Sequence, residues 1–83
     1  MTKTRIRMIT AKQCLMARAA LRWNIDSLAE AAKVGRSTIH RFETGGDIKP
    51  STITKLRATL EGQGVRFIEE GEYAGGVAHN ISR

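Results

Sequence analysis

The sequence has little of the chemistry on which disulfide-stabilised proteins and most enzymes depend. It contains one cysteine, Cys14, and two histidines among 83 residues. A single cysteine excludes an internal disulfide framework and zinc sites built from several cysteines, and it is typical of proteins in a reducing cytoplasm. A nucleophilic site needs a positioned base, and one of the two imidazoles, that of His79, lies in a C-terminal segment of little periodicity. We therefore expect no enzyme, no metal site and no cofactor.

Long hydrophobic runs and acidic residues are also scarce. The apolar stretches are only a few residues long, and residues 1–7 contain no apolar signal-peptide core, so we expect a cytoplasmic protein with no membrane span. Eight Asp plus Glu stand against 14 Lys plus Arg, which gives a formal net charge of +6. A chain of this length forms one compact domain, and its charge favours polyanionic partners.

Basic residues are concentrated at the front of the chain. Residues 1–24 contain no acid and six bases: Lys3, Arg5, Arg7, Lys12, Arg18 and Arg22. A basic terminus is either an arm that meets nucleic acid or a solvated tail, and we keep both interpretations open for residues 1–8. A strand is the third interpretation, because Ile6 and Met8 alternate with Arg5 and Arg7 there.

Capping signals and apolar periodicity predict four helices. Thr10 to Gln13 has the form of a capping box, so the first helix begins after Thr10 and ends near Trp23. Its apolar stripe is expected to contain Cys14, Leu15, Arg18, Ala19, Leu21 and Arg22. Asn24 caps a second helix over residues 25–32, and Gly35 caps a third over about residues 36–44. A fourth follows the loop and cap at residues 49–51 and ends at residue 62.

The third helix has two unlike faces. At 100° per residue, Thr38, Ile39 and Phe42 lie together on one side. The opposite face carries hydrogen-bonding side chains and no acid: Arg36, Ser37, His40, Arg41 and Thr44. Two short helices joined by a tight turn, the second with such a face, in a basic one-domain protein indicate a helix-turn-helix.

After Gly64 the apolar residues recur at every second position, which predicts a strand over residues 65–69. Its edge must pair either with the N-terminal stretch or with the same strand of a second chain. The rest of the chain is expected to be a second weak strand or a mobile tail. Because apolar side chains occur on both faces of the strand, we expect a dimer interface at Val65, Phe67 and Ile68.

Residues 24–45, NIDSLAEAAKVGRSTIHRFETG, resemble the helix-turn-helix of the Cro and phage-repressor type, the XRE family. The resemblance rests on the pair Leu28-Ala29, Val34 in the turn, the run at residues 37–39, and Glu43 with Gly45. Flanking segments extend it to about residues 9–70, and they are similar to a small bacterial subgroup. The resemblance implies a mainly α fold, a four- to five-helix phage-repressor-like helix-turn-helix domain with a short C-terminal β-strand. Residues 9–62 would form the DNA-binding domain, and residues 63–83 a strand and tail for dimerisation.

The resemblance also implies roles for single residues. An arginine of the first helix pairs with the glutamate that ends the third, which here gives Arg18 and Glu43. The sequence departs from the family pattern at three positions. Lys33 replaces a glycine of the turn, Gly35 replaces a serine cap, and Ile25 replaces a glutamine that contacts phosphate.

The leading hypothesis is a transcriptional regulator, such as a repressor, that binds an inverted repeat of double-stranded DNA as a homodimer. The expected base contacts are Arg36, Ser37, His40 and Arg41, and the expected phosphate contacts are Asn24, Thr38, Thr44 and Lys49. The alternative hypothesis is an antitoxin-like or anti-activator module, whose C-terminal strand binds a protein partner by strand addition.

Overall fold

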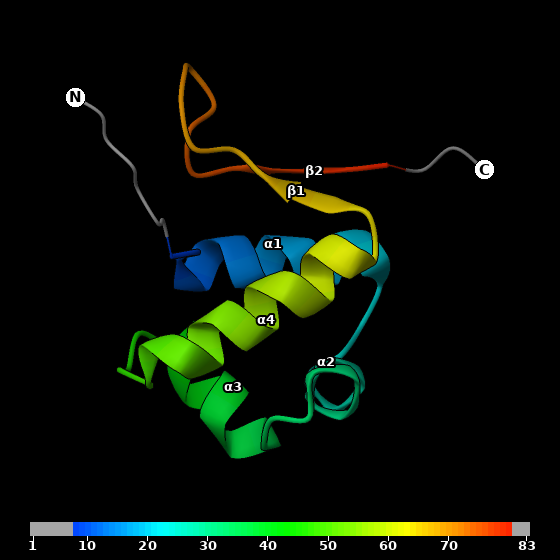
Figure 1. Cartoon of the computed structure of the whole chain (residues 1–83), viewed down its shortest axis with the longest axis vertical. Helices are drawn as coiled ribbons and strands as arrows, with labels where there is room; N and C mark the ends of the chain where they lie inside the picture. The colour runs from blue at the N-terminus through cyan, green and yellow to red at the C-terminus, as the bar shows by residue number, and fades with distance from the viewer. Residues whose placement is uncertain (1–7, 81–83) are drawn as a thin grey trace.

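The computed structural model describes residues 8–80, which form four helices and a two-stranded antiparallel sheet (Figure 1). The helices are α1 (Ala11–Leu21), α2 (Ile25–Ala32), α3 (Arg36–Glu43) and α4 (Pro50–Gly62). The strands are β1 (Val65–Phe67) and β2 (Val77–His79). The expectation of a mainly α domain is confirmed. The basic N-terminal arm or strand was expected over residues 1–8, of which residues 1–7 lie outside the described part of the chain.

Side-chain caps fix where the first two helices begin. At α1 the capping box is complete: Thr10 Oγ1 accepts from the Gln13 amide, and Gln13 Oε1 accepts from the Thr10 amide, both at 3.0 Å. At α2, Asn24 Oδ1 accepts from the Ser27 amide at 2.8 Å. Both caps were expected, because an amide at a helix start needs a side-chain acceptor and the sequence supplies one at each position.

Two non-glycine residues end helices in the left-handed conformation. Arg22 closes α1 with φ 60°, and Lys33 closes α2 with φ 59°. Lys33 stands where the XRE pattern has glycine, the residue that adopts this conformation most readily, whereas nothing in the sequence analysis marked Arg22. The left-handed residue turns the chain sharply, so that three residues, 33–35, suffice to connect α2 with α3.

Helix α4 begins two residues earlier than expected. We predicted a loop and a new cap at residues 49–51, but Lys49 is the cap and Pro50 is the first helical residue. Proline suits this position, because the first helical amide has no partner within the helix and proline has no amide hydrogen to leave unpaired.

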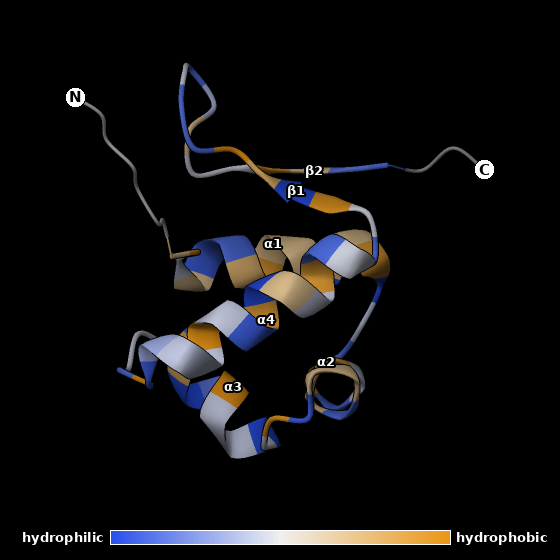
Figure 2. Cartoon of the chain, viewed as in Figure 1, coloured by the Kyte–Doolittle hydropathy of each residue, from blue (hydrophilic) through white to orange (hydrophobic). Residues whose placement is uncertain are grey.

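The core lies where the helices and the sheet meet. The sheet lies over α1 and α4, at the end of the molecule away from α2 and α3 (Figure 1). Figure 2 shows apolar segments in the helices and in β1. The buried apolar side chains come from all four helices, from β1 and from the second residue before α1: Ile9, Cys14, Ala17, Leu28, Ala32, Ile39, Phe42, Leu56, Leu60, Val65 and Phe67.

The expected apolar stripe of α1 was partly wrong. Leu15 is 43% exposed and Ala19 is exposed, whereas the buried residues of the helix are Gln13, Cys14 and Ala17. Apolar residues occupy every side of this helix, so periodicity does not mark its inner side. Gln13 faces inward because its side chain makes two hydrogen bonds. Its Oε1 accepts from the Thr10 amide in the capping box, and its Nε2 donates to the Gly76 carbonyl at 3.1 Å.

Strand β1 finds its partner within the chain. It pairs with β2 in an antiparallel register that places Val65 opposite His79 and Phe67 opposite Val77. The expectation that this strand pairs with the N-terminal stretch or with a second chain is therefore wrong for this edge, because the tail supplies a strand. Val65 and Phe67 are 3% and 5% exposed, so the core of one chain already holds the side chains we assigned to a dimer interface. Of the three, only Ile68 is half-buried.

Candidate nucleic-acid interface

Helix α3 presents one exposed polar face. Its apolar side chains, Ile39 and Phe42, are 0% and 7% exposed and anchor the helix in the core. The four residues expected to contact bases lie on the other side and are all exposed: Arg36, Ser37, His40 and Arg41. The structure therefore brings these four together on one helix surface, as the helical spacing requires.

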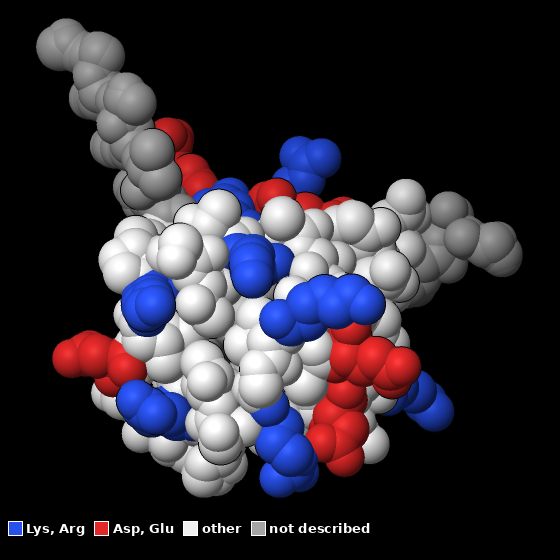
Figure 3. Space-filling view, turned by 60° about the horizontal axis from the view of Figure 1, so that its bottom comes forward, with Lys and Arg blue, Asp and Glu red and all other residues white. Residues whose placement is uncertain are grey.

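The charge of this end of the molecule is uneven. Figure 3, which turns the α2–α3 end forward, shows Lys and Arg side chains spread across the face and acidic side chains to its left, to its right and along its upper edge. The one acidic residue of α3, Glu43, is turned inward, with its side chain only 4% exposed. The exposed face of α3 therefore carries positive charge without a carboxylate of its own, an arrangement that attracts phosphate.

Arg18 and Glu43 form an ion pair that ties α1 to the end of α3. Arg18 Nη2 donates to Glu43 Oε1 at 2.7 Å, and Arg18 Nε donates to Oε2 at 2.8 Å. Arg18 Nη1 donates to the Trp23 carbonyl at 2.9 Å, and Cys14 Sγ donates to Glu43 Oε2 at 3.1 Å. The structure thus brings together the two residues that the XRE resemblance paired. It adds Cys14 and the Trp23 carbonyl, to which no pattern in the sequence pointed.

Burial and hydrogen bonding set the protonation states in this cluster. Burial by itself raises the pKa of Glu43, but the hydrogen bonds from Arg18 and Cys14 and the nearby positive charge together lower that pKa below its ordinary value. Burial, followed by the hydrogen bond to Glu43, raises the pKa of Cys14. The thiol is therefore neutral and donates a hydrogen bond, which makes it a structural group rather than a nucleophile.

The lowered pKa of Glu43 gives stability a defined dependence on pH. We expect the free energy of unfolding to fall as the pH drops below the ordinary glutamate value of about 4.3, because the unfolded chain then binds a proton that the folded chain takes up only at lower pH. This contribution is complete above that value and lost as the pH passes through the lowered pKa of the folded state. Urea unfolding from neutral pH down to about pH 3 measures it. A Glu43→Gln variant should show a shallower decline; equal slopes would contradict the assignment.

The residues expected to contact phosphate do not form one site. A shallow pocket lined by Thr38, Arg41, Ile48, Lys49 and Thr52 lies where α3 meets the start of α4, and it brings Thr38 and Lys49 together. Thr44 lies at the other end of α3 from the turn, where its hydroxyl donates to the His40 carbonyl at 2.9 Å.

Asn24 stands apart from that pocket, at the start of α2. Its Oδ1 accepts from both the amide and the hydroxyl of Ser27, at 2.8 and 3.0 Å. The side-chain oxygen is therefore engaged in capping, and only its amide nitrogen is a donor for phosphate.

One ion pair at the candidate interface has no counterpart in the sequence analysis. Arg36 Nε donates to Asp26 Oδ1 at 2.6 Å, and the two side chains are 66% and 67% exposed. The pair joins the first turn of α2 to the first turn of α3 across the turn at residues 33–35. Helical periodicity relates residues only within one helix, so no pattern in the sequence pointed to this contact.

Comparison with known proteins does not identify the chain. No family model matches the sequence, and no curated protein matches it either. In residues 8–80, no group of three His, Cys, Asp or Glu residues is placed to hold a metal ion. None of the helices in that part of the chain has the length and apolar character needed to cross a membrane.

Proposed function

We propose that the protein is a sequence-specific DNA-binding regulator of transcription, in which α2 and α3 form a helix-turn-helix of the XRE type. One observation carries the proposal: α3 is anchored by Ile39 and Phe42 and presents Arg36, Ser37, His40 and Arg41 together on its exposed face. The net charge of +6 supports a polyanionic ligand.

The side chains of α3 match the chemistry of the major groove. That groove is about 12 Å wide and admits a helix. In the proposal, Arg36 and Arg41 donate to guanine N7 and O6, while Ser37 and His40 make adaptable polar contacts. Backbone contacts come from the pocket that holds Thr38 and Lys49, which lies beside Arg41 at the edge of the face. Two copies of the chain would place two α3 helices on an inverted repeat.

Selection from random DNA tests the proposal. The full chain is incubated with double-stranded DNA that carries a random core of about 24 base pairs, enough for two half-sites one helical turn apart. Bound DNA is recovered and sequenced over several rounds. We expect enrichment of a guanine-containing motif in two inverted copies. Recovery of all sequences equally, or of none, would contradict sequence-specific binding.

The ion pair between Asp26 and Arg36 leads to a prediction on specificity. Arg36 donates to Asp26 through Nε, so its two terminal amino groups remain to donate a pair of hydrogen bonds to guanine. An exposed pair is worth at most about 1 kcal/mol, so we expect Asp26→Asn to reduce the preference for guanine at one position by up to about fivefold. Sequencing of the selected DNA measures this preference.

Asp47→Asn is the matched control for this prediction. Asp47 is exposed and lies in the loop before α4, and the substitution removes the same charge. Both variants should bind random DNA slightly more tightly, because each loses one negative charge. Only Asp26→Asn should lose base preference; an identical effect of both substitutions would show that net charge alone matters.

A further inference from the structure

We propose that Gly46 is the positioning residue for Arg41: it holds the Arg41 side chain at the edge of the α3 face and so sets the base preference at one position of each half-site. The inference rests on the proposed function, because it concerns the base that Arg41 contacts. It goes further in giving a role to a residue outside that face, in the loop between α3 and α4.

The turn that ends α3 folds residue 46 back alongside residue 41. Thr44 is the cap, and Gly45 follows it with φ 98°. The Gly45 amide donates to the Phe42 carbonyl at 3.1 Å, and the Gly46 amide donates to the Arg41 carbonyl at 2.8 Å. These two bonds form a Schellman motif, in which the side chain at position 46 frequently packs against the one at position 41. Glycine has no side chain there, so the place is open to the arginine stem.

The aliphatic stem of Arg41 occupies this place. A Cβ atom added to Gly46 would lie 2.5 Å from Arg41 Cγ, 3.2 Å from Cδ and 3.1 Å from the carbonyl oxygen. Carbon atoms in contact are about 3.5–4.0 Å apart, so a larger residue at position 46 displaces the stem. The first side-chain torsion angle sets the position of Cγ, so rotation further along the chain does not relieve the overlap. Gly46 lacks the positive φ of Gly45, so a substitution there changes this contact rather than straining the backbone.

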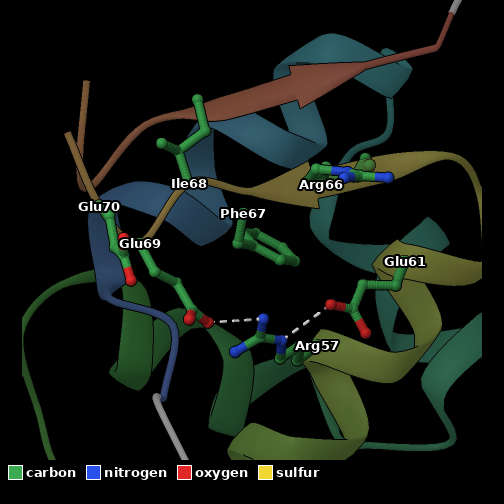
Figure 4. Close-up of a pocket in the computed structure, with 8 residues that line it drawn as sticks. Arg57, Glu61, Arg66, Phe67, Ile68, Glu69 and Glu70 are labelled. Carbon is green, nitrogen blue, oxygen red and sulfur yellow. Dashed lines mark hydrogen bonds and ion pairs between the residues drawn. The ribbon is translucent and has the colours of Figure 1, made fainter. Parts of the chain in front are cut away.

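The contact with Gly46 is what holds Arg41, because its guanidinium has no other partner in the described part of the chain. No hydrogen bond or ion pair to this guanidinium is found within residues 8–80. Arg57 shows the opposite arrangement. It donates to Glu61 and to Glu69, each at 2.9 Å, and Figure 4 shows its guanidinium between the two carboxylates. Arg57 is therefore occupied within the fold, whereas Arg41 combines a held stem with N–H donors that remain for a ligand.

A held stem with free donors is the arrangement that base recognition needs. An arginine that binds guanine loses the freedom of its side-chain torsions, and ordering such a side chain on binding weakens affinity by about two- to tenfold. Gly46 reduces this loss, because the stem is already held before DNA binds. The same loop residue therefore determines how strongly the chain prefers one base at the position that Arg41 contacts.

The rotamer of Arg41 tests the contact without DNA. Three-bond couplings to Arg41 Cγ, measured on the full isotope-labelled chain, give the populations of the first side-chain torsion angle. We expect one rotamer to dominate in the parent, and Gly46→Ala to replace it or to average several rotamers. Gly62→Ala is the matched control, because an added Cβ there meets nothing within 4 Å beyond its own helix and Gly62 has no positive φ. Equal populations in the parent and in Gly46→Ala would overturn the proposal.

Binding to the selected DNA tests the consequence. With single-base variants of the selected site, fluorescence anisotropy should show that Gly46→Ala lowers base preference about two- to tenfold, at the position where Arg41→Ala lowers it. In the Arg41→Ala background, Gly46→Ala should add nothing, because the stem it displaces is gone while the nearby carbonyl of residue 41 is still present. An added loss in that background, or a loss at another position, would show that the glycine acts through the turn and would overturn the positioning role.

The two measurements separate this inference from the proposed function. If no DNA is selected, the proposed function fails together with the effect on base preference, but the rotamer populations still decide whether Gly46 holds Arg41. If DNA is selected and Gly46→Ala leaves the rotamer unchanged, only the positioning role fails. Thermal melting of each variant checks that the fold is intact.

Discussion

Replacing Glu43 with alanine is expected to lower the free energy of unfolding by about 3–5 kcal/mol, as for a buried ion pair that loses one partner. The Arg18 side chain is only 15% exposed, and without Glu43 its charge keeps one hydrogen bond, to the Trp23 carbonyl. Cys14 loses its acceptor at the same time. A domain of this size has a total stability of about 4–12 kcal/mol, so the loss should be at least about a quarter of the total. Urea unfolding at neutral pH measures the loss.

An exposed ion pair provides the control for this prediction. Glu61 accepts from Arg57 at 2.9 Å, but its side chain is 44% exposed, so Glu61→Ala should cost no more than about 1 kcal/mol. The contrast between two glutamates, each paired with an arginine, separates the effect of burial from the effect of pairing. Equal losses in the two variants would contradict the structural role assigned to Glu43.

Replacing Arg41 with alanine is expected to weaken binding to the selected DNA by about 1–3 kcal/mol, which is roughly five- to 150-fold. Arg41 is exposed on α3 next to the pocket that holds Thr38 and Lys49, so its guanidinium is placed between base edges and backbone. Base preference should be lost at one position in each half-site, while thermal stability stays close to that of the parent. Arg36→Ala should have the same effect at a different position. Fluorescence anisotropy with single-base variants of the selected site measures both.

Arg41→Lys is the control that separates base contacts from phosphate contacts. Lysine keeps the charge but lacks the planar fork that matches guanine. If Arg41 contacts a base, the lysine variant should bind with reduced base preference. If it bound with the full preference of the parent, Arg41 would be a phosphate contact, and the base-contact assignment would be wrong.

Local patterns predicted the helices well because the information they need is local. The caps at Thr10 and Asn24, the turn at Lys33 and the two faces of α3 depend on residues within one or two helical turns. A second weak strand was one of the two alternatives for the tail, but its pairing with β1 was missed, because β2 has only three residues and the glycine-containing loop over residues 68–76 brings it back to β1. A strand this short leaves almost no alternation to detect.

Contacts between elements were predicted only where information beyond local patterns was at hand. The pairing of Arg18 with Glu43 followed from a resemblance, which carries knowledge of a packed fold. The pairing of Asp26 with Arg36 followed from nothing in the sequence, because the turn between the two helices determines whether their first turns face each other. The predicted orientation of Leu15 was wrong for a related reason. A helix that is apolar on every side takes its orientation from its neighbours.

Because of its position, the Cys14 thiol can report how often the core of the protein opens. This thiol is the one cysteine of the chain, is fully buried, and is held by Glu43 at the contact between α1 and α3. An alkylating reagent reaches its sulfur only after these two helices separate, so the labelling rate measures how often the core opens under native conditions. Added DNA should slow the labelling if binding requires the α1–α3 contact to stay closed, and this can be followed without attaching any probe.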